Sequence, residues 1–347
     1  MELRRLGRSD LRVSVIGLGT MTWGQQNTEA DAREQLAVAL DAGVNLVDAA
    51  EMYPVPPRPE TQGTTEEILG RCLRASGRRA DVVLATKITG PGRAFGWVRE
   101  GRTRYQAAHL TAAVEGSLRR LGTDTIDLYQ LHWPERSTNY FGQLEYKHAP
   151  GEVATPPEET LRALQDLVAA GKVRHLGLSN ESPWGVMAFL RAAELAGLPR
   201  VVSVQNPYSL LNRTYEIGLA EVGLREDVGL LAYSPLGMGA LSGKYEGGRA
   251  WPADARMTLF ERFRRYASPA SLAACERYAE LARANDLAPE VMALAFILRQ
   301  PFLGSALVGA TTLAQLRVDL SAAQVALPGP VLAGIEQIHR AGPNPAP

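Results

Sequence analysis

Three polar residues and a tyrosine are spaced so that they could act together on a carbonyl group. Asp48, Lys87 and His132 each stand at the end of a short apolar run, and Tyr53 comes five residues after Asp48. A tyrosine hydroxyl, with an ordinary pKa of about 10, can give its proton to a developing alkoxide. A neighbouring ammonium lowers that pKa by stabilising the phenolate. The pattern predicts Tyr53 as proton donor, Lys87 as the group that tunes it, Asp48 as the group that holds Lys87, and His132 as the group that orients the carbonyl oxygen.

The apolar runs later in the chain end in neutral polar residues. Ser179, Asn180 and Gln205 offer hydroxyl and amide groups that suit a carboxamide such as that of nicotinamide. Tyr233 offers an aromatic face for a flat ring, and Thr20 ends the first run in the same way. This chemistry requires no metal, and the histidines lack the spacing of a metal site.

Two segments rich in Gly, Ser and Thr are candidates for binding phosphate. They are Ser234–Lys244 and Gly309–Gln315, and the second opens a predicted helix, where free N–H groups can meet an anion. Neither common nucleotide fingerprint fits. A GxGxxG motif after Gly17 would need a third glycine at Thr22, and a P-loop ending at Lys244 would need its first glycine at Met238.

The elements that position these residues alternate regularly. Short apolar runs, nearly continuous as parallel strands covered on both faces must be, alternate with helical patterns about eight times. Eight units without a linker favour a (β/α)8 TIM barrel over an open doubly wound sheet, and we expect one domain over residues 1–347. The predicted strands are Val13–Leu18, Val44–Val47, Val82–Ala85, Ile126–Leu131, Val173–Leu178, Val201–Val204, Gly229–Ala232 and Ala306–Val308.

Capping signals and periodicity predict the helices. Thr28 opens a helix with Asp31 three residues later, and Gly43 follows its end. Val291–Leu298 is interpreted as a buried core helix, too short to cross a membrane. The other predicted helices, after Thr28–Ala42, are Thr64–Arg74, Thr111–Leu121, Glu158–Ala170 and Ser182–Ala196.

The ends of the chain and three long connections complete the predicted architecture. Leu3–Leu6 and Leu11–Val13 are expected to form a short hairpin before the barrel, and the Pro-rich tail Ala341–Pro347 is expected to be loose. Three long connections follow strands, so in a barrel they rise on the C-terminal face, where active sites lie. They are Thr89–Gln106, Trp133–Thr155 and Ser234–Pro269.

Composition narrows the function classes. The 347 residues carry a formal net charge of +0, so a large basic field for nucleic acid or acidic membranes is not expected. Cys72 and Cys275 lie in no metal or redox spacing, which favours two indifferent thiols in a reducing compartment. The N-terminus lacks the apolar stretch of a signal peptide, and no run is long enough for a membrane span. These features predict a cytoplasmic location.

With these residues in place, the chain resembles the aldo-keto reductase superfamily from about Leu3 to Leu320. Each matching motif is only moderately specific, but seven occur in the family's order. The details resemble the bacterial branch near the voltage-gated potassium channel β subunits. The motifs are GVNLVDAAEMY (43–53), ATK (85–87), LYQLHWP (128–134), GLSN (177–180), VQNPYSLLNR (204–213), LAYSPLGMGALSGKY (231–245) and GATTLAQL (309–316).

The resemblance implies reduction of aldehydes or ketones by NADPH, with Asp48, Tyr53, Lys87 and His132 as the catalytic tetrad. Trp23, Met52 and Trp133 adjoin catalytic positions and are candidates for an apolar substrate wall. The residues expected to bind the cofactor are Thr20, Ser179, Asn180, Gln205, Tyr233, Ser234, Leu236, Gly239, Lys244, Arg256, Gly309, Thr311, Thr312, Gln315 and Asp319.

One residue departs from the family pattern. Asp319 stands where the family usually has Asn near the adenine, and its charge disfavours a nearby 2′-phosphate. Lys244 and Arg256 favour that phosphate. NADPH is therefore the expected cofactor, with NADH as the alternative.

Two other functions remain open at this point. A barrel that binds NADPH and senses redox state for a partner would bind cofactor tightly and turn over slowly. A Schiff-base aldolase using Lys87 would need no nicotinamide, although the tetrad spacing speaks against it. The sequence specifies neither the carbonyl substrate nor the oligomeric state.

Overall fold

A computed structural model describes residues 1–92 and 95–347. Eight parallel strands form a closed barrel, because the last strand, β10, pairs with the first barrel strand, β3. This confirms the predicted TIM barrel. The barrel strands are β3 (Ile16–Gly19), β4 (Leu46–Asp48), β5 (Val83–Ile88), β6 (Ile126–Leu131), β7 (Val173–Ser179), β8 (Val201–Pro207), β9 (Gly229–Tyr233) and β10 (Leu303–Val308).

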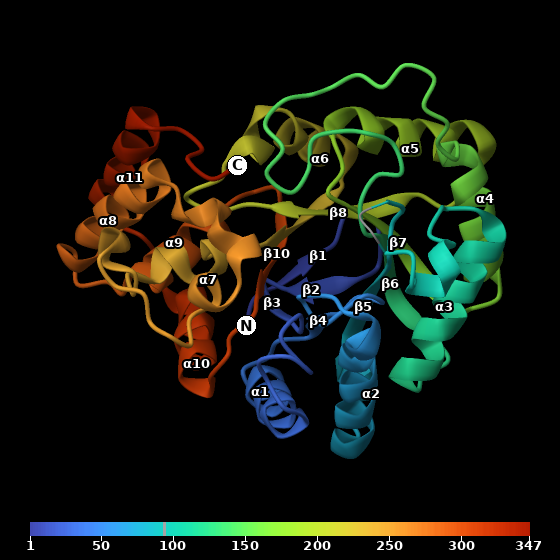
Figure 1. The fold of residues 1–347 in the computed structure, drawn as a ribbon, viewed down its shortest axis with the longest axis horizontal. Coiled ribbons are helices and arrows are strands. Elements are labelled where there is room, and N and C mark those ends of the chain that lie inside the picture. Colours follow the sequence, from blue (N-terminus) through green and yellow to red (C-terminus); the bar gives the residue numbers. More distant parts are fainter. Residues whose placement is uncertain (93–94) are drawn as a thin grey trace.

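Helices surround the strands on all sides (Figure 1). The predicted helices are confirmed with small shifts at their ends, and α9 is the predicted buried core helix. The helices are α1 (Glu29–Asp41), α2 (Thr64–Ser76), α3 (Ala107–Leu121), α4 (Pro157–Ala169), α5 (Pro183–Ala196), α6 (Leu219–Glu226), α7 (Arg256–Leu259), α8 (Pro269–Arg283), α9 (Pro289–Leu298), α10 (Leu313–Ser321) and α11 (Gly329–Ala341). Short 3-10 helices, labelled η, lie between them.

The local signals that predicted α1 act as expected. The Thr28 side chain accepts a hydrogen bond from the Asp31 N–H, and the Asp31 carboxylate accepts one from the Thr28 N–H. This reciprocal pair satisfies two N–H groups that the first helical turn leaves without partners. Gly43 follows the helix with a φ of 84°, a left-handed conformation that glycine adopts without steric cost.

A hairpin covers the N-terminal end of the barrel. It consists of β1 (Leu3–Arg5) and β2 (Arg12–Ser14), and its buried Leu6 and Leu11 pack against side chains inside the barrel. The predicted strand Val13–Leu18 is therefore wrong as one unit. It divides at Val15, whose N–H bonds back to the hairpin while its carbonyl accepts from the barrel strand β10.

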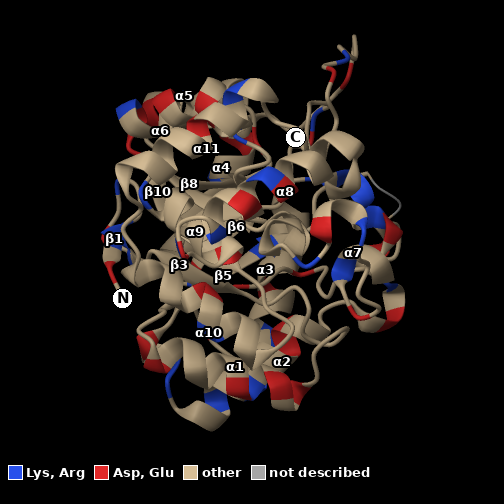
Figure 2. Cartoon of the chain, turned by 90° about the vertical axis from the view of Figure 1, so that its left-hand side faces the viewer, with Lys and Arg blue, Asp and Glu red and all other residues tan. Residues whose placement is uncertain are grey.

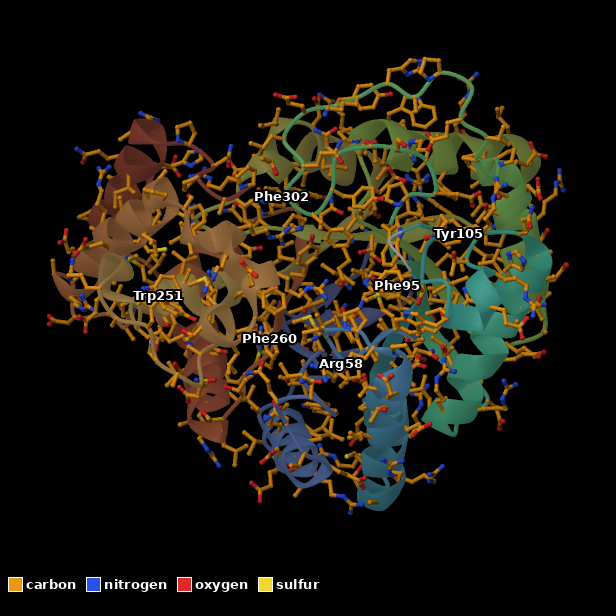
Figure 3. All side chains as sticks on the ribbon, in the orientation of Figure 1. Arg58, Phe95, Tyr105, Trp251, Phe260 and Phe302 are labelled. Atoms are coloured by element: carbon orange, nitrogen blue, oxygen red, sulfur yellow. The ribbon has the colours of Figure 1, made fainter. Side chains whose placement is uncertain are left out.

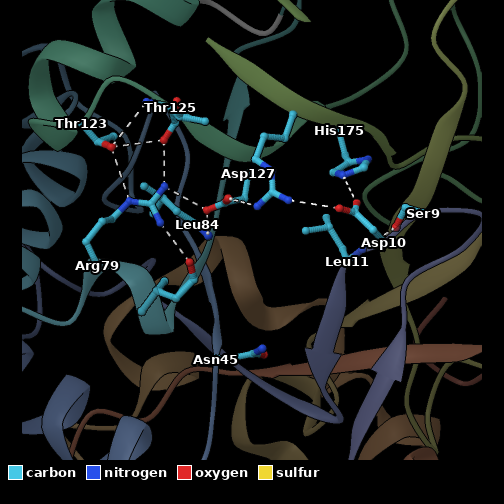
Figure 4. A network of polar contacts seen from close by, with 12 residues as sticks. Ser9, Asp10, Leu11, Asn45, Arg79, Leu84, Thr123, Thr125, Asp127 and His175 are labelled. Atoms are coloured by element: carbon cyan, nitrogen blue, oxygen red, sulfur yellow. Dashed lines mark hydrogen bonds and ion pairs between the residues drawn. The ribbon is translucent and has the colours of Figure 1, made fainter. Parts of the chain in front are cut away.

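A network of charges fastens this hairpin to the bottom of the barrel (Figure 4). Asp127 on β6 pairs with Arg79 at 2.9 Å and with Arg174 at 3.0 Å. Arg174 continues to Asp10 in the hairpin turn at 3.3 Å, and His175 contacts Asp10 at 2.7 Å. The carboxylates in this network thus all have cationic partners.

The three long connections rise at the opposite end, as predicted. Figure 2 places β1 and α7 at opposite ends of the molecule. The third connection, residues 234–268, is less loop-like than expected, because it contains η5 (Gly237–Ser242), η6 (Glu246–Gly248), α7 and η7 (Glu261–Ala267). Buried Tyr245, Phe263 and Tyr266 give these short helices a core of their own.

The C-terminal tail contradicts the prediction that it is loose. Asn344 Oδ1 accepts the Arg213 N–H at 2.6 Å, and the Ala346 N–H donates to the Leu211 carbonyl at 3.1 Å. Ala346 is buried. The prolines lack N–H donors, so the residues between them make the backbone contacts that hold the tail.

Within the described ranges, no single helix is both long and apolar enough to cross a membrane. One sharply bent pair of helices, Leu313–Gln324 with Gly329–Ala341, meets the length and composition criteria together.

Candidate active site

A cavity of about 570 Å³ opens at the C-terminal end of the barrel. Its size is in the range of sites that hold a cofactor and a small substrate. The polar residues predicted at strand ends line it, together with the two predicted phosphate segments. The predicted residues on its wall are Thr20, Asp48, Met52, Tyr53, His132, Trp133, Ser179, Asn180, Gln205, Tyr233, Ser234, Leu236, Gly239, Lys244, Arg256, Gly309, Thr311, Gln315 and Asp319.

Lys87 lies beneath the cavity floor rather than on its wall. Its side chain is fully buried and forms an ion pair with Asp48 at 2.5 Å, while its ammonium also donates to the Ala49 carbonyl at 2.8 Å. Burial alone lowers the pKa of Lys87, but the Asp48 carboxylate and Tyr53 together outweigh it and the pKa is raised. The ammonium is therefore kept charged inside the barrel, as the predicted role of Asp48 requires.

Tyr53 is the next group toward the cavity. Its hydroxyl lies 3.5 Å from the Lys87 ammonium, which is 4.9 Å from the centre of the ring. Burial raises the pKa of Tyr53, and the ammonium opposes this shift without reversing it. The expected lowering by Lys87 is therefore present but is smaller than the effect of burial. Tyr53 therefore carries its proton at neutral pH.

Gln130 supports this group, and the sequence pattern did not reveal it because it lies within an otherwise apolar strand. It is fully buried, and its amide donates to Asp48 at 3.0 Å. Gln205 donates to the same carboxylate oxygen at 3.0 Å and to Gln130 at 3.0 Å. A polar side chain in a strand covered on both faces must find a partner, and this was the signal that could have revealed it.

His132 and its neighbours form the aromatic side of the cavity. The His132 ring lies 5.8 Å from the Tyr53 ring and 4.9 Å from the Trp133 ring, centre to centre. The Tyr105 hydroxyl donates to the Trp133 carbonyl at 2.5 Å, and Figure 3 shows Phe95 nearer the barrel centre than Tyr105. Phe95 and Phe141 also line this side, and the sequence pattern did not reveal either, because both come from long connections.

The neutral polar residues form a connected group on the next strands. Tyr233 donates to Asn180 at 2.7 Å, and Asn180 donates to the His132 carbonyl at 2.8 Å and to Ser179 at 3.1 Å. Asn180 and Ser234 both have a positive φ, 53° and 52°. Non-glycine residues in this conformation concentrate at functional sites, because neighbouring structure must hold them there.

The far end of the cavity carries cations. Burial lowers the pKa of Lys244 and lowers that of Arg256 to about 10. A Cβ on Gly239 would lie only 2.9 Å from Lys244, so this glycine makes room for the lysine. The Ser234 hydroxyl and Arg256 Nε are buried without a hydrogen-bond partner among the described residues. Such groups fit an anion that accepts hydrogen bonds.

Asp319 lies at this end, nearly buried at 6% exposure. Burial, together with a smaller contribution from the unpredicted cavity residue Glu290, raises its pKa to about 7 against the opposing charge of Lys244. Near neutrality the carboxyl group is therefore divided between its neutral and charged forms.

Besides Lys87, two predicted site residues do not line the cavity. Trp23 is fully buried, and its indole N–H donates to Gln35 at 2.8 Å, so its assignment to the substrate wall is wrong. Thr312 instead caps α10, accepting the Gln315 N–H at 3.2 Å, while its neighbour Thr311 lines the cavity. Both errors arise because adjacent residues on a turn point in different directions.

Comparison with known proteins agrees with this arrangement. The family model described as Aldo/keto reductase family matches residues 15–340. Protein tas of Escherichia coli is 49% identical over 347 residues, which cover 100% of both chains. The uncharacterized oxidoreductase YrpG of Bacillus subtilis is 32% identical over 97% of this chain and 96% of its own. An aldo-keto reductase of Babesia bovis is 36% identical over 69% of this chain and 88% of its own.

The closed barrel and the polar cavity at its C-terminal end thus belong to an oxidoreductase fold. The chain is a member of the aldo/keto reductase family.

Proposed function

We propose that the protein reduces aldehydes and ketones to alcohols with NADPH, using Tyr53 as proton donor. The observation that carries this proposal is the buried series Asp48, Lys87, Tyr53. The ion pair between the first two is 2.5 Å long, and the tyrosine hydroxyl lies 3.5 Å from the ammonium. A positive charge fixed behind a protonated hydroxyl is the arrangement that proton donation needs.

The residues on the cavity wall fit a nicotinamide dinucleotide. Ser179, Asn180 and Gln205 offer amide and hydroxyl groups for the carboxamide, and Tyr233 offers a ring face for stacking. At the other end, the residues for the phosphates and adenosine would be Ser234, Leu236, Gly239, Lys244, Arg256, Gly309, Thr311, Gln315 and Asp319, with Thr20 near the ring end. When bound, the cofactor supplies the hydride that adds to the carbonyl carbon.

The protein's own part is to place and protonate the carbonyl oxygen. Tyr53 gives its proton to that oxygen as negative charge develops there, and the Lys87 ammonium stabilises the phenolate that remains. His132 orients the oxygen from the neighbouring strand end. The aromatic side of the cavity, which includes Trp133 and Met52, excludes water from the reacting groups.

NADPH is the proposed cofactor, since Lys244 and Arg256 supply two cations at the phosphate end. Asp319 opposes a 2′-phosphate when charged, and this opposition is limited because its pKa is raised to about 7. NADH is the weaker alternative.

A titration with NADPH and NADH, followed by nicotinamide fluorescence, tests the proposal when 4-nitrobenzaldehyde is then added. The expected result is tighter binding of NADPH and an aldehyde-dependent loss of the signal. Tight binding with very slow turnover of every carbonyl tried would favour the redox-sensing alternative. Failure to bind either cofactor would overturn the proposal.

We further propose that residues 1–347 act as one domain and that it works in the cytoplasm. Pairing between β3 and β10 joins opposite ends of the chain in one barrel. Both cysteines are free and buried, which suits a reducing compartment.

A further inference from the structure

Two arginines from the short helix η7 line the cavity, and the proposed reaction uses neither. They are Arg262 and Arg265. Buried Phe263 and Tyr266 anchor η7 against α7, α8 and η5, which fixes the positions of Arg262 before them and Arg265 between them. Arg264 does not line the cavity. Its side chain is 60% exposed and lies 4.0 Å from Glu261.

Arg265 lies at the end of the cavity where the carbonyl would react. Its guanidinium donates to the Tyr266 hydroxyl at 2.8 Å and stacks 4.8 Å from the centre of that ring. Its Cδ would lie 3.4 Å from a Cβ on Gly142, next to Phe141 of the aromatic side. It is also close enough to Tyr233 to oppose the rise that burial causes in the pKa of that tyrosine.

The balance of charge at this end is positive. Asp48 is neutralised by Lys87. No carboxylate within residues 1–92 and 95–347 forms an ion pair with Arg265. The C-terminal carboxylate of Pro347 is the nearest anion, since one of its oxygens and Arg265 Nη1 would lie 3.5 Å and 3.7 Å from a Cβ on Gly142. The other acids on the cavity wall, Asp254, Glu290 and Asp319, act on Lys244 at the phosphate end instead. The Arg265 guanidinium donates to Tyr266 but has no carboxylate within ion-pair distance among the described residues, so it can bind an anion other than the cofactor phosphates.

We propose that the substrate is an aldehyde or ketone that carries a carboxylate, and that Arg265 binds this carboxylate. A planar guanidinium can make two parallel hydrogen bonds to a carboxylate, and a partly desolvated pair of this kind is stronger than a neutral contact. The aromatic side of the cavity, with Phe95 and Phe141, faces the carbon skeleton between the two polar ends. This inference rests on the proposed reductase function for its carbonyl end only.

A binding measurement tests the carboxylate site without turnover. Benzoate and its neutral isostere benzamide are titrated into the full chain, with and without NADPH, while tryptophan fluorescence reports on Trp133 in the cavity wall. The charged probe is expected to bind at least about ten-fold more tightly. Equal affinity for the two probes would overturn the proposal.

Variants then assign the preference to one side chain. Arg265→Met should remove most of the benzoate preference, and Arg265→Lys should keep part of it, because the charge remains without the planar fork. Arg264→Met is the matched control, with the same loss of charge one residue away on the exposed side, and should keep the full preference. An Arg265→Met protein that retained the preference would contradict the assignment. A ten-fold loss of NADPH affinity in that variant would also overturn it, by assigning Arg265 to the cofactor.

Turnover separates this proposal from the reductase function. 4-Carboxybenzaldehyde and 4-formylbenzamide differ chiefly in charge, and wild-type protein should show a kcat/KM ratio of about ten or more in favour of the acid. Arg265→Met should bring that ratio close to one. Benzoate selectivity without reduction of either aldehyde would support the carboxylate site and count against the reductase. Reduction of both aldehydes at equal kcat/KM would support the reductase function and count against the carboxylate site.

Discussion

The two ends of the barrel differ in whether their charged side chains form ion pairs. At the N-terminal end, Asp127 lies between Arg79 and Arg174, and the network continues to Asp10 and His175 (Figure 4). At the C-terminal end, Asp319, Lys244 and Arg256 line the cavity without an ion pair among the described residues. Figure 2 shows Lys and Arg segments gathered near α7, at this second end.

This difference separates structural charges from functional ones. The paired charges at the N-terminal end hold the hairpin against the barrel and require no ligand. Charges without partners at the top cost stability, because burial shifts their pKa values toward the neutral form. Such a cost is expected where a ligand supplies the missing partner. The Lys87–Asp48 pair is the exception at the top, since the protein itself must keep that ammonium charged.

We expect the largest loss of stability when the ion pair between Lys87 and Asp48 is removed. Lys87→Met leaves the Asp48 carboxylate buried without its cation, which costs about 3–5 kcal/mol of unfolding free energy. Lys244→Met is the matched control, since it removes a cavity lysine that has no carboxylate within ion-pair distance among the described residues. It should leave the stability of the cofactor-free protein unchanged or slightly higher. Urea unfolding measures the unfolding free energy of both variants. An equal loss of stability in the two would contradict the difference between paired and unpaired charges.

Asp319→Asn should give the next largest effect, and only above acidic pH. The pKa of Asp319 is raised to about 7 from 3.8, so its stabilising contribution is complete below about pH 4 and is lost as pH rises to about 7. The variant should therefore be more stable than wild type at pH 8, by on the order of 4 kcal/mol, with no difference near pH 4. As pH rises, the affinity for NADPH should also fall less in Asp319→Asn than in wild type.

Exposed Asp254, on the wall of the same cavity, provides the control for this prediction. Asp254→Asn should leave the pH dependence of unfolding as in wild type. A flat difference between wild type and Asp319→Asn from pH 4 to pH 8 would contradict the raised pKa.

Asp127→Asn tests the bottom of the barrel. The change removes the negative charge and one of the two acceptor oxygens that Arg79, Arg174 and the Leu84 N–H share, and should cost about 1–3 kcal/mol. The values of kcat and KM should stay within about two-fold of wild type, because the network lies at the end away from the cavity. A large fall in kcat in a folded variant would show that the two ends are coupled.

Asp10→Asn should have the smallest effect. The side chain is 70% exposed, so its contacts with His175 and Arg174 contribute about 0.2–1 kcal/mol and weaken in salt. Burial raises the pKa of Asp10, but His175, Arg174 and the local hydrogen bonds together lower it overall. The contribution is thus present above about pH 4 and disappears as pH falls through the lowered pKa. Thermal unfolding at two salt concentrations and two pH values measures it.

The sequence predicted the barrel well because each strand and helix carries its own signal. Ile126–Leu131 matches its strand at both ends, and the Thr28–Asp31 cap fixes the start of α1. The proposed catalytic residues were predicted to lie together by the same logic, since parallel strands bring the residues at their ends to one place. That rule alone predicted that Asp48, Lys87 and His132 lie close together.

What the sequence could not predict depends on tertiary contacts. Arg265 and Phe141 reach the cavity from long connections that have no periodic pattern. Trp23 and Thr312 adjoin cavity residues but turn away, because the path of a turn decides side-chain direction. Ala346 is buried only because the tail meets Leu211, which lies far away in sequence. The net pKa of Tyr53 also required the structure, since burial and the Lys87 charge act against each other.

The central claim is that Tyr53 donates the proton in carbonyl reduction. The most direct test is the rate of NADPH oxidation by 4-nitrobenzaldehyde in Tyr53→Phe, with Tyr146→Phe, an exposed tyrosine, as control. We predict a fall in kcat of about 10²- to 10⁴-fold for Tyr53→Phe, with the Kd for NADPH within about two-fold of wild type and no change in the control. Turnover by Tyr53→Phe within a few-fold of wild type would contradict the account.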